Sequence, residues 1–234
     1  MKIGEVSWTD FKQKGFSLAL VPTGSTEQHG PHGPMATDTI IAEAIAARSA
    51  EATETILLPA INVGVSREHG KFPGSLYLPP DVFRDQLRET ILSAYNSGID
   101  KFVVVNGHGG NIASVQEVCK GLYHDREVKA IEWTWFNAIS SGPMGHAGEL
   151  ETSFIMYLRE ELITNPLEKG ASSWGKRIHG TRIAYDTSKF TKNGIVGDPT
   201  KATKERGEKL FEESTEKLID LIEDFKNSEG TFFD

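Results

Sequence analysis

Apolar segments alternate with amphipathic segments along most of the chain, and this alternation limits the folds that the chain can adopt. Four short apolar runs are typical of strands. They cover residues 16–22, 55–61, 101–106 and 128–136. Longer segments with apolar residues three or four positions apart are typical of helices. They cover residues 38–51, 79–98, 111–123, 149–162 and about 199–225. Because strands alternate with helices, we expect an α/β fold with a mostly parallel sheet that is covered on both faces.

The length and charge of the chain restrict its class. With 234 residues the chain can bury one sizeable core, and we expect a single domain over residues 1–234. The net charge of −8 argues against nucleic acid and anionic membranes as partners. Since no apolar run has the length of a membrane span and the N-terminus lacks a signal-peptide pattern, we expect a cytoplasmic protein. Cys119, the only cysteine, excludes an intramolecular disulfide, and its helical surroundings indicate a small core residue.

Histidine follows each of the four predicted strands. In open α/β sheets, ligands bind at the carboxyl ends of the strands. The segments that follow the strands read GSTEQHGPHGPMATD, NVGVSREHGKFPGS, NGHGGN and, a short way on, GPMGHAGELETS. They contain imidazole and carboxylate groups that are far apart along the chain but are expected at one edge of the sheet: Glu27, His29, Asp38, His108 and Glu151.

These five side chains are predicted to bind metal. Imidazole and carboxylate are ligands of zinc, manganese and iron(II), and no cysteine is present for a thiolate site. Two metals commonly share a bridging carboxylate and activate water between them, and Asp38 suits that position. Asp38 also fits a helix cap, and Glu149 is an alternative to Glu151. His146, five residues before Glu151, is the expected general acid or base, because the imidazole pKa lies near working pH.

Other residues of these segments are candidates for substrate contacts. A glycine-rich turn can also bind phosphate, but NGHGGN lacks the dinucleotide pattern and the P-loop lysine. We expect Gly109 and Gly110 to let the backbone approach a metal or substrate, and Ser66 and Ser75 to lie in the pocket wall. His69 is either a ligand contact or a surface residue.

Together the motifs resemble those of the creatininase (creatinine amidohydrolase) family. The resemblance rests on VPTGSTEQHGPHGPMATDT, GVSREHGKFPGS, NGHGGN, GHAGELETS and GIVGDPTKATKERGEKL, and it extends from Gly4 to about Leu210. It implies a three-layer α/β/α sandwich with a mostly parallel sheet. It also implies a binuclear centre, of zinc or of zinc with manganese or iron, that hydrolyses non-peptide C–N bonds, mostly of cyclic amides or formamides.

Carried over residue by residue, the resemblance implies a role for each predicted ligand. Glu27 and His108 would hold one metal. His29 and Glu151 would hold the other, and Asp38 would bridge the pair.

His146 matches the catalytic histidine of the family, which protonates the leaving nitrogen, but its surroundings differ from creatininase proper. After NGH, creatininase proper has a Tyr-Glu pair whose glutamate binds metal, and this chain has Gly109 and Gly110. Four residues before the catalytic histidine, creatininase proper has a tryptophan of its aromatic lid, and this chain has Gly142. We therefore do not expect creatinine to be the physiological substrate.

Several alternatives stay open. Other branches of the family deformylate a formylamino-pyrimidine nucleotide or trim a peptide in mycofactocin maturation, and the motifs do not choose among them. A metal-free relative that binds a small molecule would belong to a different class. The resemblance suggests a homo-oligomer, often a hexamer, and a partner could cover Trp174, Phe232 and Phe233. The loop-rich segment 170–198 is either a lid or an oligomer contact.

Overall fold

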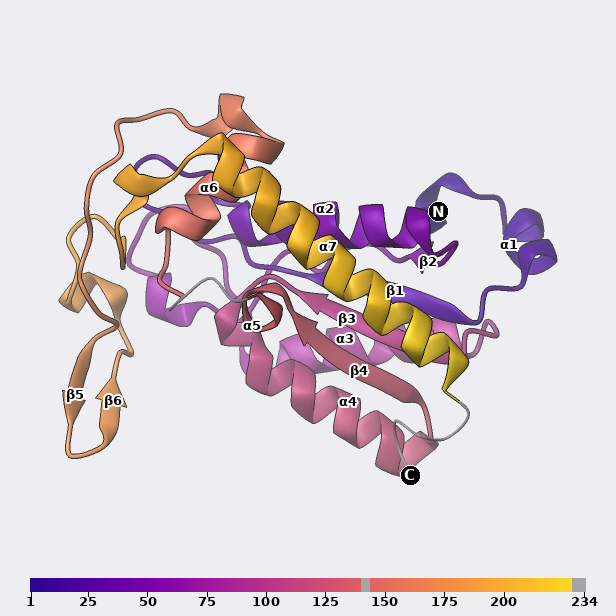
Figure 1. Cartoon of the computed structure of the whole chain (residues 1–234). Helices are drawn as coiled ribbons and strands as arrows, with labels where there is room; N and C mark the ends of the chain where they lie inside the picture. Colours follow the sequence, from indigo (N-terminus) through magenta and orange to yellow (C-terminus); the bar gives the residue numbers. More distant parts are fainter. Residues whose placement is uncertain (140–143, 229–234) are drawn as a thin grey trace.

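The computed structural model describes residues 1–139 and 144–228. At its centre lies a parallel sheet with the strand order β2-β1-β3-β4 (Figure 1). The strands are β1 (Leu18–Thr23), β2 (Ile56–Leu57), β3 (Lys101–Asn106) and β4 (Lys129–Thr134). Thr23 of β1 lies opposite Asn106 of β3, which lies opposite Thr134 of β4. The carboxyl ends of these three strands are therefore level.

Helices cover both faces of this sheet and form the three-layer α/β/α sandwich that the sequence predicts. Figure 1 shows α2 and α7 above the sheet and α3 and α4 below it. The helices are α1 (Trp8–Lys14), α2 (Thr37–Ala52), α3 (Pro80–Tyr95), α4 (Ile112–Arg126), α5 (Trp135–Ala138), α6 (Glu149–Leu158) and α7 (Lys204–Asn227). Short 3₁₀ helices cover Ile3–Glu5, Arg67–His69, Gly109–Asn111, Glu160–Leu162, Thr187–Lys189 and Pro199–Lys201. In the described ranges no helix has both the length and the apolar character that a membrane span requires.

Alternate positions of the central strands supply two apolar clusters. Leu18 and Leu20 of β1 pack on the side of α2, α6 and α7, whereas Ala19 and Val21 pack on the side of α3 and α4. Both faces of β1 are thus buried, as its continuous apolar sequence predicts. Cys119 of α4 belongs to the second cluster, and burial raises the pKa of its thiol to about 12, which confirms that it is a core residue.

Among the elements whose bounds differ from the sequence prediction are β2, β4 and α7. β2 is limited to Ile56–Leu57, because Pro59 lacks a backbone donor for the ladder. β4 ends at Thr134 because Trp135 begins α5. The buried indole of Trp135 packs edge-on against Phe154, with ring centroids 4.8 Å apart. α7 begins at Lys204, later than residue 199, because the Thr203 hydroxyl caps it.

The side chain of Asn106 fixes the carboxyl edge of the sheet. Its Oδ1 accepts hydrogen bonds from the Thr23 hydroxyl at 3.1 Å and from the His108 backbone N–H at 3.2 Å. Its Nδ2 donates to the His108 carbonyl at 2.8 Å and to the Thr134 hydroxyl at 3.0 Å. One buried amide therefore ties the ends of three strands to the turn that carries His108.

Gly107 lies where this turn approaches the backbone of α2 closely. A Cβ atom at Gly107 would lie 2.2 Å from the Asp38 carbonyl oxygen. We expect Gly107→Ala to lower the free energy of unfolding by about 1–3 kcal/mol, because backbone must move to relieve the overlap. Denaturant unfolding measures the change.

Gly121→Ala is the matched control, since nothing lies within 4 Å of its added Cβ in α4. It should leave stability unchanged or raise it by up to about 1 kcal/mol. Equal stabilities for the two variants would contradict the close approach.

Candidate metal centre

The segments after the strands enclose a cavity of about 360 Å³ at the carboxyl edge of the sheet. The predicted site residues that line it are Glu27, Asp38, His108, Gly109, Gly110, His146 and Glu151. His29 adjoins this lining through Asp38. The structure therefore brings the five predicted metal ligands together, and each of them is buried.

Asp38 lies between two histidines. Its Oδ1 is 3.2 Å from His29 Nε2, and its Oδ2 is 3.0 Å from His108 Nδ1. Asp38 lies within the first turn of α2, whose N-cap is Ala36, so it does not cap the helix as the alternative interpretation required. Each carboxylate oxygen faces a different imidazole, which is the arrangement that a bridging ligand needs.

Glu27 faces the same cluster from the segment that follows β1. Its Oε2 lies 3.4 Å from His108 Nε2. Its Oε1 lies 3.5 Å from His69 Nε2 and 3.6 Å from His146 Nδ1. The side chain of Glu27 thus connects the predicted metal ligands with His146 and with a further buried histidine, His69.

Glu151, rather than Glu149, reaches the histidine cluster. Both residues lie in the first turn of α6, where side chains two positions apart point in different directions. Glu151 Oε1 is 3.8 Å from His29 Nε2, and its Oε2 accepts a hydrogen bond from Ala147 N–H at 2.6 Å. Glu149 lines a neighbouring cavity instead.

Three imidazoles share one hydrogen-bonding pattern. His29 Nδ1 lies 3.1 Å from the carbonyl of Glu27, and His108 Nε2 lies 3.0 Å from the carbonyl of Val65. His146 Nε2 lies 2.7 Å from the carbonyl of Gln28. A carbonyl only accepts, so in each ring this nitrogen carries the proton and the other nitrogen faces carboxylates. Metal-binding histidines in proteins are oriented by this kind of outer hydrogen bond.

The buried carboxylates fit a metal centre. Neither oxygen of Glu27 has a hydrogen-bond partner among the described residues, and its side chain is fully buried. Burial, opposed by His108, raises the pKa of Glu27 to about 8. An ionised carboxylate in this place needs a cation. Three overlapping sets place their ligand atoms within 4.8 Å of one another: Glu27–His29–Asp38, His29–His146–Glu151 and Glu27–His69–His146.

The histidines of the cluster divide into two electrostatic classes. Burial disfavours the charged form of His108, but the charges of Glu27 and Asp38 outweigh it and raise its pKa to about 10. The pKa of His29 is raised in the same way, mainly by Asp38 against the effect of burial. Burial lowers the pKa of His69 to about 3 and holds that of His146 well below its usual range. His29 and His108 therefore occupy positions that favour a cation, whereas His69 and His146 are neutral.

Gln28 fixes the tautomers of the two neutral histidines. Its Nε2 lies 2.8 Å from His69 Nδ1 and donates to the Gly194 carbonyl at 3.0 Å. It also lies 2.8 Å from His146 Nε2, but that nitrogen already directs its proton to the Gln28 carbonyl. The two amide protons therefore go to His69 and Gly194, and the Nδ1 atom of His146 is left free to accept a proton.

The predicted substrate contacts are only partly in the cavity. Gly109 and Gly110 line it, and a Cβ at Gly110 would lie 2.2 Å from the Val65 carbonyl oxygen. This position therefore has no room for the metal-binding glutamate of creatininase proper. Ser66 and Ser75 are not among the lining residues: the Ser66 hydroxyl hydrogen-bonds Ser25, and that of Ser75 accepts from Gln28 N–H.

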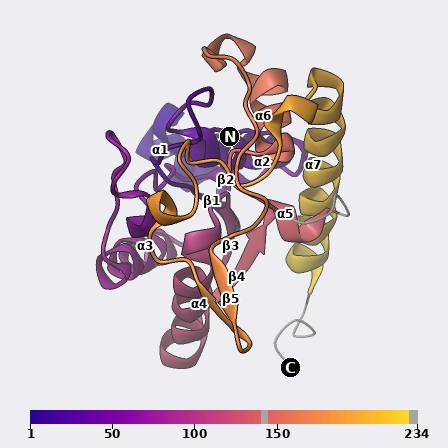
Figure 2. The same cartoon turned by 90° about the vertical axis from the view of Figure 1, so that its left-hand side faces the viewer.

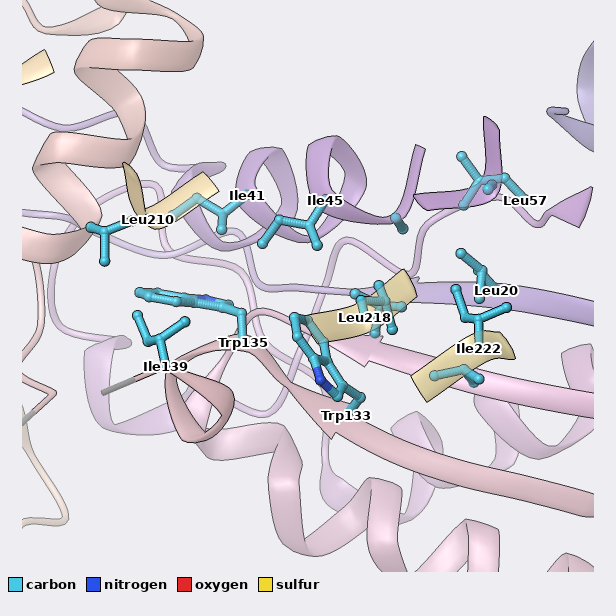
Figure 3. Close-up of a cluster of buried hydrophobic side chains, with 14 of the residues drawn as sticks. Leu20, Ile41, Ile45, Leu57, Trp133, Trp135, Ile139, Leu210, Leu218 and Ile222 are labelled. Carbon is cyan, nitrogen blue, oxygen red and sulfur yellow. The ribbon is translucent and has the colours of Figure 1, made fainter. Parts of the chain in front are cut away.

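Sequence reasoning missed part of the cavity wall. Trp174 lines the cavity, with its ring centroid 5.7 Å from that of His146, although the sequence indicated only an exposed aromatic. Arg182 also lines it, and no periodic pattern marks either residue. Trp133 and Trp135, in contrast, are buried in the core (Figure 3). Gly142, where the family lid tryptophan was sought, lies outside the described residues.

Comparisons with known proteins agree with this centre. Residues 4–222 match the family described as "Creatininase: Creatinine amidohydrolase". The mycofactocin precursor peptide peptidase of Mycobacterium ulcerans is 32% identical over 87% of this chain and 83% of that protein. That of Mycolicibacterium smegmatis is 32% identical over 88% and 84%. Creatinine amidohydrolase of Pseudomonas putida is 21% identical over 94% and 95%.

Two solved creatininase structures share the fold. One, named "Creatininase Mn", superposes with a TM-score of 0.81 at 20% identity and covers 97% of this chain and 99% of that chain. A mutant creatininase described as "Zn-Zn type" gives a TM-score of 0.83 at 19% identity, over 97% and 98%.

The metal-free protein should lose stability as pH rises from about 6.5 to about 10. A histidine whose pKa is raised on folding stabilises the folded state fully below its unfolded pKa of about 6.5, and the contribution disappears as pH passes the folded value. For His108 that value is about 10. Thermal unfolding of chelator-treated protein measures this loss. The loss should be smaller in His108→Asn, and identical pH profiles for the two proteins would contradict the assignment.

Proposed function

The chain belongs to the creatininase family, and from this premise we propose that it is a divalent-metal-dependent hydrolase that cleaves the C–N bond of a small amide or formamide. One observation carries the proposal. Buried carboxylates and histidines, oriented through backbone carbonyls, converge on a cavity beside a neutral histidine with a free ring nitrogen. A metal-free binding protein would have no use for a fully buried carboxyl group such as Glu27, whose two oxygens lack hydrogen-bond partners among the described residues.

Two metal positions suit the donor set. Glu27 and His108 would hold one ion together with Asp38, whose Oδ2 faces His108 Nδ1. His29 Nε2 and Glu151 Oε1 would hold the other together with Asp38 Oδ1. Zinc, manganese or iron(II) bound there would polarise the amide carbonyl and lower the pKa of bound water.

His146 is the proposed proton carrier. Its Nε2–H donates to the Gln28 carbonyl at 2.7 Å, so the proton transferred in the reaction enters and leaves at Nδ1. Nδ1 faces Glu27 and the cavity, where the scissile bond would lie. From there it would take a proton from the attacking water and deliver it to the departing nitrogen.

A peptide bond at the end of a short peptide is the second candidate. A further cavity of about 550 Å³ adjoins the first and shares with it Met144, Gly145, Glu151, Trp174 and Arg182. Such a bipartite space suits a substrate longer than a single ring. The mycobacterial relatives named as peptide peptidases support this candidate too.

Asp38→Asn should reduce the metal content of the purified protein to fewer than two ions per chain, because the amide cannot bridge two cations as a carboxylate does. Elemental analysis after purification without chelator measures this. Asp125→Asn, on the exposed end of α4, is the control with the same change of charge. Two ions in Asp38→Asn would show that Asp38 is not the bridge.

His146→Ala should retain its metals and lose about 10²–10⁴-fold of its turnover number, since general acid–base catalysis contributes about that much. The measurement is released amine or formate from a panel of cyclic amides, formamides and short peptides, and the panel also separates the two candidate functions. His124→Ala, at the exposed end of α4, is the matched control. Full activity of His146→Ala would exclude the proposed proton transfer. Loss of both metals would instead assign His146 as a ligand.

A further inference from the structure

The β5–β6 hairpin places two arginines side by side. Its strands, β5 (Lys176–Ile178) and β6 (Thr181–Ile183), are joined at His179 and Gly180, whose φ angles are +46° and +85°. Positive φ at both central residues is the pattern of a tight type I′ hairpin turn. In this ladder Arg177 is paired directly with Arg182. Directly opposed residues lie on the same face, so two like charges meet there at a cost in stability.

Two lysines form ion pairs with carboxylates of segment 170–198. Lys71 pairs with Asp186 at 2.5 Å, and Lys169 pairs with Asp198 at 3.2 Å. No carboxylate in the described part of the chain lies within ion-pair distance of Arg177 or Arg182. The arginine pair is therefore a local excess of positive charge in a chain whose net charge is −8.

Arg182 stands where the two cavities meet. It lines the cavity of about 360 Å³ beside the metal centre and the adjoining cavity of about 550 Å³. Figures 1 and 2 both show that the 170–198 segment lies at the carboxyl end of the sheet, with the hairpin projecting from it. Among the described lining residues of the inner cavity, Arg182 is the only lysine or arginine, whereas Glu27, Asp38, Glu68 and Glu151 are acidic.

We propose that Arg182, with Arg177 beside it, binds an anionic group of the substrate, either a carboxylate or a phosphate, while the amide lies at the metal centre. This inference rests on the proposed hydrolase function of the same cavity. A guanidinium matches both oxoanions through paired N–H donors, and an anion between the two arginines removes their mutual repulsion. The substrate class is thus an amide with a negatively charged substituent.

Three probes test the proposal by binding, independently of turnover. N-acetylglycine carries a carboxylate, N-acetyl-phosphoethanolamine carries a phosphate, and N-acetylglycinamide is the neutral match. Isothermal titration calorimetry with the metal-loaded protein measures their dissociation constants in wild type, Arg182→Gln and Arg182→Lys. Lys176→Gln is the control, because it removes one charge from the same hairpin at a position adjacent to Arg177, and adjacent strand residues point to opposite faces.

We expect one anionic probe to bind about tenfold more tightly than the neutral probe in wild type and in Lys176→Gln, as a charge-assisted hydrogen bond of this kind would give. This preference should fall to about threefold or less in Arg182→Gln, and Arg182→Lys should recover part of it. The probe that is preferred identifies carboxylate or phosphate as the natural group.

Any of three results would overturn the proposal: equal binding of charged and neutral probes to wild type, no measurable binding of either anionic probe, or the same preference in Arg182→Gln as in Lys176→Gln. The last result would mean that the metals alone attract the anion. This experiment measures binding and not turnover, so failure of this proposal can be distinguished from failure of the proposed function. If only the proposed function were wrong, the protein would still prefer anionic probes but would hydrolyse no amide.

Discussion

The burial of Glu27 and Asp38 beside His29 and His108 governs the rest of this structure. Carboxylates in a low-dielectric interior need positive charge within a few ångströms. Two sources are at hand: protons on the histidines, which the raised pKa of His108 reflects, or metal ions that displace those protons. Metal binding, protonation and stability are therefore coupled in one cluster. That coupling explains why three rings commit one nitrogen to a backbone carbonyl and direct the other at carboxylates.

Holding such a cluster requires a stiff frame, and polar side chains after β3 provide it. Asn106 joins the ends of β1, β3 and β4. Asn111 donates to the Gly24 carbonyl at 2.9 Å and accepts from Val65 N–H at 2.9 Å. It thus ties the segments that follow β1 and β2 to the segment that follows β3. These contacts are local to strand ends, where the level register of the parallel sheet already brings the segments together. The predicted ligands are therefore held mainly by contacts among the segments that follow the strands.

This locality explains which features could be predicted from the sequence. The helix–strand alternation indicated the layers, and the predicted strand 101–106 coincides with β3, because an apolar run buried on both faces has no other stable place. The inward face of α2 could not be predicted in this way: Ile41, Ala42, Ile45 and Ala46 are fully buried, whereas Ile40, Ala44 and Ala47 are only partly buried. α2 packs against β1, α6 and α7 together, so its apolar pattern has no single face to reveal. The predicted homo-oligomer stays a prediction.

The residues proposed to contact the substrate differ from the proposed metal ligands in how the chain positions them. Trp174 and Arg182 belong to segment 170–198, which has no helical or extended periodicity and is held by long-range pairing, such as Val196 with His146 and with Ala171. No local pattern could place their side chains, because their positions depend on where the chain returns after α6. Such a segment can change its side chains without disturbing the strand ends. A family built in this way can keep one reaction centre and vary the compounds that reach it, so the substrate has to be sought in the residues of this segment.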